Sequence, residues 1–224
     1  MKIKCLFLCF AMAFVSCSET DERKEYGLKG NVKSYFERVY KAEKKFGKWE
    51  KGNIAYYGHN QVIFDKKGVF QEFECYDRAM NLTEKRIPIR EKGKMLEKIF
   101  YYGNGNLYRK SVYTHISKNE IDFERFNSDE EKVGYGKIIR RNGRMTNQFY
   151  TKIYSDVERE KLTTVLYEYD KDGNLISEKH IEEGVIYFSL RYEYLEFDAK
   201  KNWTKRLIFD EYEPQIAIRE IEYF

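Results

Sequence analysis

Short runs of apolar and aromatic residues alternate with charged residues along most of the chain. In segments 165–169, 190–197 and 216–223, Tyr, Phe, Ile, Leu or Val returns at about every second position. An alternation of period two predicts half-buried β-strands, and these residue types suit a pleated surface. The best helical candidate, 156–163, is short and weak, and the polar segment 128–132 is expected to be a loop.

A recurring motif separates these runs. It consists of an aromatic residue, Asp, two further residues, Gly or a substitute, Asn or a variable residue, and an apolar residue. The best copy is YDKDGNL at 169–175, further copies lie at 64–70, 76–82, 101–107 and 197–203, and a looser one lies at 140–145. In a hairpin connection Asp accepts backbone N–H bonds, and Gly or Asn adopts a positive φ. We therefore assign a turn-forming role to Asp65, Gly68, Gly105, Asp170, Gly173, Asn174, Asp198 and Asn202.

Successive hairpins with short connections predict a mainly β fold: an antiparallel meander that forms one extended, twisted or curved sheet with little helix. No Pro- or Ser-rich linker interrupts residues 27–224, so we expect a single domain there. A content of 42% hydrophobic and 17% aromatic residues excludes a disordered chain. The pattern leaves open whether the sheet is open, curved or two-layered.

The first residues are organised as a processing signal. Lys2 and Lys4 precede an uncharged apolar run at 5–15, which is shorter than the about 20 residues of a membrane-spanning helix. The run ends at Ser16 followed by Cys17, and a small residue directly before a Cys resembles the bacterial lipobox. That resemblance implies loss of residues 1–16 and a lipid on Cys17, although Phe14 stands where Leu is usual. The alternatives are an ordinary secretory signal cut nearby or an uncleaved anchor.

Residues 17–26 are then expected to be a lipid-bearing Cys and an acidic tether. The stretch from Ser18 to Glu22 resembles the export signal of Bacteroidetes lipoproteins that reach the cell surface. The resemblance implies an outer-membrane position, at the cell surface rather than facing the periplasm. The alternative is a solvated tether that is merely acidic.

The repeats resemble a known group as well. Residues 167–175 are similar to the YD repeat of large secreted and surface β-rich proteins. Segments 27–33, 202–206 and 219–223 are similar to uncharacterised Bacteroidetes lipoproteins with such repeats. The resemblance implies an antiparallel β architecture and a cell-envelope location. Because that group has no agreed activity, it transfers no catalytic residue.

The residue types of catalytic and metal sites are scattered. His59, His115 and His180 have no second ligand at zinc-motif spacing. Counted from Asp170, the Gly and Glu of an EF-hand loop are out of place, and 103–108 lacks the third Gly of a dinucleotide fingerprint. We therefore expect no metal, no cofactor and no enzymatic activity.

Cysteine usage and charge exclude further classes. With Cys5 and Cys9 in the signal and Cys17 lipidated, only Cys75 remains, so an internal disulfide is excluded. We interpret Cys75 as a small buried hydrophobe. The 41 basic residues only slightly exceed the 37 acidic ones, and we expect no nucleic-acid partner.

The abundance of tyrosine, 20 residues, allows two interpretations. The rings are either cross-strand packing partners or an exposed row that binds a protein or glycan. The first functional hypothesis is a non-enzymatic, lipid-anchored binding module of the outer membrane. The alternative is an immunity or antitoxin-like protein that neutralises a toxin, for which the near-neutral charge gives no support.

Overall fold

The chain folds into one antiparallel sheet that closes on itself. A computed structural model describes residues 21–55, 58–154 and 159–224. Its strands are β1 (Val32–Lys45), β2 (Lys48–Ile54), β3 (His59–Phe64), β4 (Phe70–Tyr76), β5 (Leu82–Glu91), β6 (Lys94–Tyr102), β7 (Leu107–His115), β8 (Glu120–Asn127), β9 (Lys132–Arg141), β10 (Arg144–Tyr154), β11 (Arg159–Tyr169), β12 (Leu175–Glu182), β13 (Val185–Phe197), β14 (Trp203–Phe209) and β15 (Gln215–Tyr223). A short 3-10 helix, η1 (Glu22–Tyr26), precedes them.

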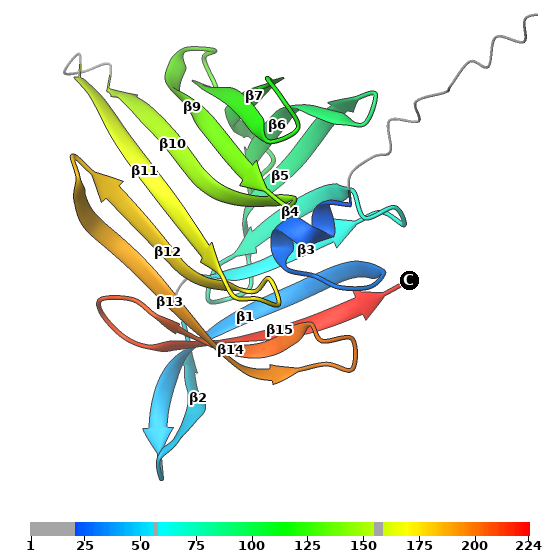
Figure 1. Ribbon diagram of the computed structural model, residues 1–224, viewed down its shortest axis with the longest axis vertical. Helices are drawn as coiled ribbons and strands as arrows, with labels where there is room; N and C mark the ends of the chain where they lie inside the picture. The colour runs from blue at the N-terminus through cyan, green and yellow to red at the C-terminus, as the bar shows by residue number, and fades with distance from the viewer. Residues whose placement is uncertain (1–20, 56–57, 155–158) are drawn as a thin grey trace, which may run out of the picture.

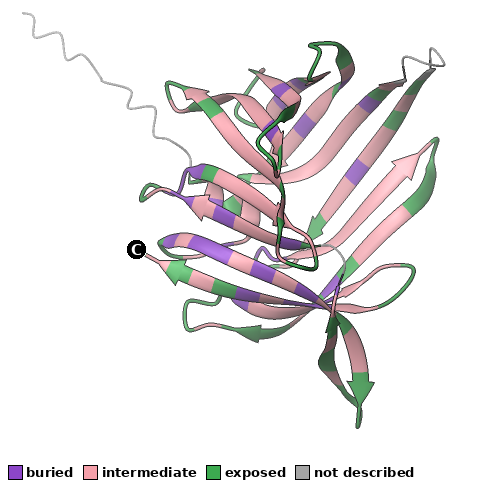
Figure 2. Ribbon diagram, turned by 180° about the vertical axis from the view of Figure 1, so that it is seen from behind, coloured by how far each residue is buried: buried purple, intermediate pink, exposed green. Residues whose placement is uncertain are grey.

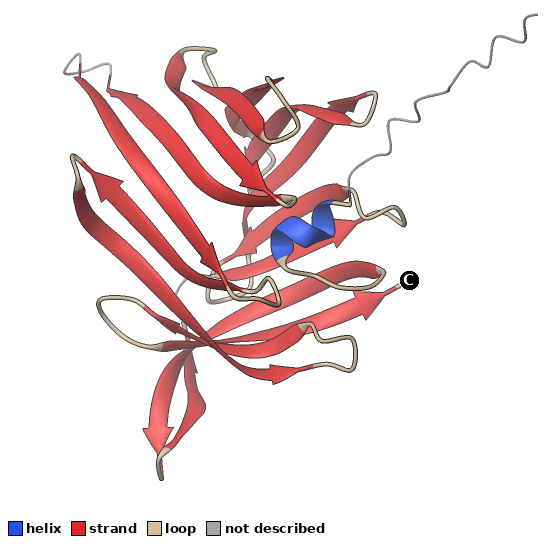
Figure 3. Cartoon of the chain, in the orientation of Figure 1, coloured by secondary structure: helices blue, strands red, loops and turns tan. Residues whose placement is uncertain are grey.

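The strand order confirms the predicted antiparallel meander and adds a closure that the sequence did not predict. Consecutive strands pair from β3 through to β15, and β15 also pairs with β1. Fourteen strands thus form a barrel, while β2 pairs only with the distal part of β1 as a projecting hairpin (Figures 1 and 3). The expected extended sheet is therefore a closed one. Closure leaves the barrel strands without a free edge.

Six of the connections share one turn geometry. In the turn from Asp170 to Asn174, the Asp170 N–H donates to the Asn174 carbonyl at 2.9 Å and the Gly173 N–H to the Asp170 carbonyl at 3.0 Å. The Asp170 carboxylate accepts the Asn174 N–H at 2.8 Å. The same backbone pair closes the turns that begin at Asp65, Asp77, Tyr102, Asn127 and Asp198. The fourth residue of each has a positive φ: Gly68, Met80, Gly105, Glu130, Gly173 and Lys201.

Several local expectations need correction. The expected turn copy at 140–145 is a two-residue connection instead, in which Asn142 and Gly143 have φ of 53° and 77°. The described part of the helical candidate, from Arg159 onward, belongs to β11, because its alternating residues pair with β10 and β12. The expected loop at 128–132 is confirmed as a turn up to Glu131, and only Lys132 already belongs to β9.

The expected tether also differs from the structure. Residues 1–20, including Cys17 and the proposed signal, lie outside the described residues, but Asp21 to Tyr26 are folded against the barrel. The Asp21 carboxylate caps η1 by accepting the Arg23 N–H at 3.1 Å, and Gly27 ends it with φ of 68°. These two residues are the sequence signal that identifies the helix.

The apolar core lies at the η1 end. Buried residues of β1, β3 and β4 pack there with Tyr26 of η1, and Figure 2 shows buried positions concentrated in the strands beside η1. The cluster consists of Leu28, Val32, Tyr35, Val62, Phe64 and Phe70. Smaller clusters surround Trp203 and Phe123. About eight strands give a barrel that side chains fill, whereas 16–18 leave an aqueous channel, so fourteen strands leave room for an interior cavity.

Candidate functional site

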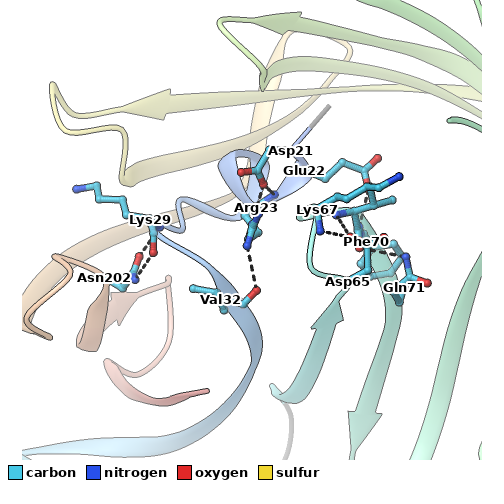
Figure 4. Close-up of polar contacts among 11 residues, drawn as sticks. Asp21, Glu22, Arg23, Lys29, Val32, Asp65, Lys67, Phe70, Gln71 and Asn202 are labelled. Atoms are coloured by element: carbon cyan, nitrogen blue, oxygen red, sulfur yellow. Dashed lines mark hydrogen bonds and ion pairs between the residues drawn. The ribbon is translucent and has the colours of Figure 1, made fainter. Parts of the chain in front are cut away.

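Helix η1 lies at one end of the barrel, where it contacts β4, β5 and β9. The Glu22 carboxylate accepts the Phe70 N–H at 2.8 Å (Figure 4). It also pairs with Arg90 Nη2 at 2.6 Å. The Glu22 N–H donates to the carbonyl of Gly68 at 2.9 Å. A Cβ at Gly68 would meet Asp21 and Arg23 within 2.4 Å, so this turn requires glycine for close approach as well as for its φ of 87°.

Two further contacts tie this segment to other strands. Glu25 pairs with Arg140 at 2.7 Å, and burial raises the pKa of the Glu25 carboxyl despite that positive neighbour. The Lys29 N–H donates to Asn202 Oδ1 at 2.6 Å, and Asn202 Nδ2 donates back to the Lys29 carbonyl at 2.8 Å. The segment 22–29 is therefore held by β5, β9 and two of the Asp-containing turns.

The predicted turn residues lie at both ends of the barrel. Three of the turns, those of Asp65 and Gly68, Asp170 to Asn174, and Asp198 and Asn202, lie at the η1 end, whereas that of Gly105 lies at the opposite end. The structure does not gather these residues into one site. The carboxylates of Asp65, Asp170 and Asp198 accept N–H groups of their own turns.

A buried ion cluster lines the inner wall where the barrel closes. Glu37 of β1 accepts from Arg219 Nη2 at 2.9 Å and from Arg206 Nη2 at 3.1 Å. Both guanidinium groups lie over the Trp203 ring, at 3.6 and 4.2 Å from its centroid. Burial alone would raise the pKa of Glu37, but the charges of Arg206 and Arg219 and their hydrogen bonds outweigh it and lower that pKa. All polar groups of the Glu37 carboxylate are engaged within the protein, which indicates a structural role.

A cavity of about 310 Å³ opens on the inner wall of β8 and β10–β13. The strand registers place most of its lining residues on one face of the sheet, since Arg125 is opposite Gly134, Tyr150 opposite Thr163, and Val165 opposite His180. The lining comprises Arg125, Gln148, Tyr150, Lys152, Lys161, Thr163, Val165, Tyr167, His180, Glu182 and Tyr187. Aromatic, hydroxyl, amide and charged groups thus converge on one space, as in small-molecule sites.

A second cavity, of about 520 Å³, lies on the outer wall beside the β1–β2 hairpin. Its lining is mostly charged and includes the ion pair between Lys205 and Glu196 at 3.1 Å. The rest of the outer wall is similar, with ion pairs such as Lys33–Glu222 and Lys179–Glu168. Because no aromatic residue lines this larger cavity, the inner one is the better candidate site.

The tyrosines divide between the two interpretations. Tyr35 and Tyr192 are buried packing residues, and Tyr150 and Tyr167 face the inner cavity. The exposed ones, including Tyr212 at 84% exposure, come from separate strands and loops. The sequence therefore detected the aromatic surplus but could not assign most of it to the interior.

The histidines and the cysteine are placed as follows. His59 is buried, where its Nδ1 accepts the Val39 N–H at 3.2 Å and its Nε2 donates to the Ala55 carbonyl at 3.0 Å. His180 pairs with Glu178 at 2.6 Å. Cys75 is only partly buried, and burial raises the pKa of its thiol to about 11. Among the described residues, no three His, Cys, Asp or Glu side chains are placed to hold a metal ion.

Within the described ranges, no helix combines the length and the apolar character needed to cross a membrane.

No family model matches the chain, and no curated protein matches it significantly. Among solved structures, a porin-like protein from Bacteroides uniformis aligns over 87% of this chain and 98% of its own, with 8% identity and a TM-score of 0.46. A Bacteroides fragilis protein of unknown function aligns over 54% and 86%, with 13% identity and a TM-score of 0.34. A LolA superfamily protein from Nitrosomonas europaea aligns over 92% and 93%, with 9% identity and a TM-score of 0.31. None of these likenesses assigns the chain to a family.

Proposed function

We propose that this protein is a non-enzymatic binding protein of the bacterial cell envelope that holds a small ligand inside its barrel. The observation that carries the proposal is the inner cavity, whose lining combines Tyr150 and Tyr167 with Gln148, Thr163 and Arg125. Aromatic rings and a few converging polar groups are the composition of ligand sites. Because the outer wall is charged, we propose that water surrounds the barrel.

The location part of the proposal rests on Cys17, which resembles a lipidated cysteine. Several acyl chains, at about 0.8 kcal/mol per buried methylene, make a firm anchor. Cys17 is four residues before Asp21, so at most about 14 Å of chain separates the anchor from η1. A lipid at Cys17 would hold the η1 end near the membrane and direct the opposite end of the barrel away from it.

Labelling with a fatty-acid analogue tests the anchor. The wild-type chain should incorporate the label and partition into membranes, whereas Cys17→Ala should do neither. Equal labelling of the two chains would contradict the anchor.

Native mass spectrometry of protein purified from its own envelope tests the ligand. Thr163→Trp fills the cavity, whereas Thr164→Trp places the same side chain on the opposite face of β11. We expect an additional bound mass in the wild type and in Thr164→Trp that Thr163→Trp loses. A bound mass that survives in Thr163→Trp would place the ligand elsewhere.

A further inference from the structure

The inner wall of β7 and β8 carries two arginines that lack carboxylate partners. Arg109 and Arg125 come from neighbouring strands, and their register places them diagonally on the same face, because Arg125 is opposite Ser111. Within the described chain neither guanidinium forms an ion pair or a side-chain hydrogen bond. The Nε of each is buried without a hydrogen-bond partner. The Nε atoms of Arg90, Arg140, Arg206 and Arg219 are buried without a hydrogen-bond partner as well, but these four arginines have carboxylate partners, so the missing carboxylate is what distinguishes Arg109 and Arg125 from them.

The nearest carboxylate does not neutralise this pair. Glu84 is already held by Arg86 Nε and by the Tyr108 hydroxyl. Burial lowers the pKa of Arg109, and the charge of Arg125 acts in the same direction. The charge of Glu84 opposes these two effects only in part, so the inner wall carries two adjacent positive charges without a carboxylate partner of their own.

Aromatic rings fix the orientation of both groups. The Arg109 Cζ lies 4.1 Å from the centroid of the Phe100 ring, and the Arg125 Cζ lies 4.2 Å from that of Tyr150. A guanidinium is planar by resonance, and stacking on a ring fixes its orientation and leaves its N–H edge free for a planar or tetrahedral anion. Arg125 and Tyr150 line the inner cavity, and Arg109 lies diagonally beside Arg125, next to that lining.

We infer that Arg109 and Arg125 bind the carboxylate or phosphate group of a ligand held in the inner cavity. This inference rests on the proposed use of the cavity and specifies the ligand class as anionic. Arginine forks match carboxylate and phosphate oxygens with two parallel hydrogen bonds. The tyrosine and hydroxyl groups further along the cavity then contact the uncharged part of the ligand.

Calorimetric titration of the full-length protein at constant ionic strength tests the inference. The probes are inorganic phosphate, glucuronate and the neutral sugar glucose. We expect at least one anion to bind, and Arg109→Gln and Arg125→Gln each to weaken it by about tenfold or more. Binding of phosphate alone would point to a phosphorylated ligand, and binding of glucuronate alone to a carboxylated one.

The chain offers a matched control. Arg191 also stacks on a ring, 4.2 Å from the Phe209 centroid, but it pairs with Glu193 and is exposed, so Arg191→Gln should leave binding unchanged. Circular dichroism shows whether the Gln variants fold. If they do not, Arg125→Lys takes their place: it keeps the charge but loses the paired hydrogen bonds of arginine, so we expect it to weaken anion binding several-fold. Absence of anion binding, or equal affinity in the wild type and the Arg125 variants, would overturn the inference. Glucose binding that Arg125→Gln leaves intact would overturn the anionic assignment alone and leave the cavity as a binding site.

Discussion

Glu37 of β1 lies directly opposite Arg219 of β15 in the strand pair that closes the barrel, and Arg219 donates to it across 2.9 Å. The two residues are 182 positions apart in the sequence. Their side chains are buried, and Arg206 of β14 supplies a second donor. This contact therefore ties the two ends of the meander together by a charge that water cannot reach.

Glu37→Gln should destabilise the barrel strongly. Removing one partner of a buried ion pair costs about 3–5 kcal/mol, because the remaining charges stay buried without compensation. Urea unfolding at pH 7 measures the loss. Glu220→Gln is the control, since the neighbouring Glu220 pairs with Arg38 on the exposed outer wall and should contribute less than about 1 kcal/mol. Equal losses for the two variants would contradict the role given to the closing contact.

The same residue predicts a pH dependence. The folded pKa of Glu37 is lowered from 4.5, so its contribution to stability is fully present above pH 4.5 and is lost as the pH falls through the folded pKa. The stability difference between the wild type and Glu37→Gln should therefore shrink in acid. Unfolding curves from pH 7 down to pH 3 provide the measurement, and a difference that stays constant would show that folding does not lower the pKa of Glu37.

Substitutions at two glycines allow the cost of backbone strain in a turn to be compared with the cost of a steric clash. Gly105 and Gly173 have φ of 87° and 85°, but a Cβ meets nothing within 4 Å at Gly105, whereas at Gly173 it would displace the Arg144 side chain. Gly105→Val should cost about 1–2 kcal/mol from the left-handed backbone alone, and Gly173→Val at least as much. Thermal unfolding measures the loss of stability in both variants.

Asp170→Ala removes the side-chain acceptor of the same turn and should cost about 1 kcal/mol of stability. If added calcium raised the melting temperature of the wild type but not that of Asp170→Ala, the turn would be a ligand loop.

Docking of η1 should depend on Glu22. Glu22→Ala removes the pair with Arg90 and the acceptor of the Phe70 N–H, at a cost of about 1–3 kcal/mol. Hydrogen exchange should become faster at residues 22–28 and at the Phe70 amide. Lys24→Ala is the control, because Lys24 is exposed in the same helix. Exchange that is the same in both variants would mean that apolar packing alone holds η1.

Local features of the fold were predictable from the sequence because they depend on neighbouring residues. The alternation near Val165 fixes a strand, and the spacing of Asp170, Gly173 and Asn174 matches a turn whose hydrogen bonds all lie within five residues. The turn at Asn127 has the same geometry, but Asn replaces Asp there, and the polarity of 128–132 predicts only a loop. Asp21 and Gly27 are capping residues that indicate a helix, whereas the acidic composition of this segment predicts a tether.

Closure and the interior could not be predicted in this way. The pairing of β1 with β15 depends on the accumulated twist and register of the β1–β3 pair and of the twelve successive hairpins from β3 to β15, which no local pattern contains. Alternation also does not say which face is inside when arginines and aromatic rings share one face. Arg109, for example, lies over Phe100 on the inner wall, so its charge does not indicate that it faces the outside of the barrel.

The accessibility of two adjacent positions on β11 tests the central claim, an interior space bounded by a closed wall. Thr163→Cys places a thiol in the cavity, and Thr164→Cys places one on the outer face. The labelling rate of each variant is measured with a small methanethiosulfonate and with a maleimide carrying a large polyethylene glycol. The background rate of the parent chain is subtracted. We predict that both reagents label Thr164→Cys, whereas at Thr163→Cys the rate of the large reagent relative to the small one is at least about tenfold lower than at Thr164→Cys. Equal rates of the large reagent at both positions would contradict the closed barrel and its interior site.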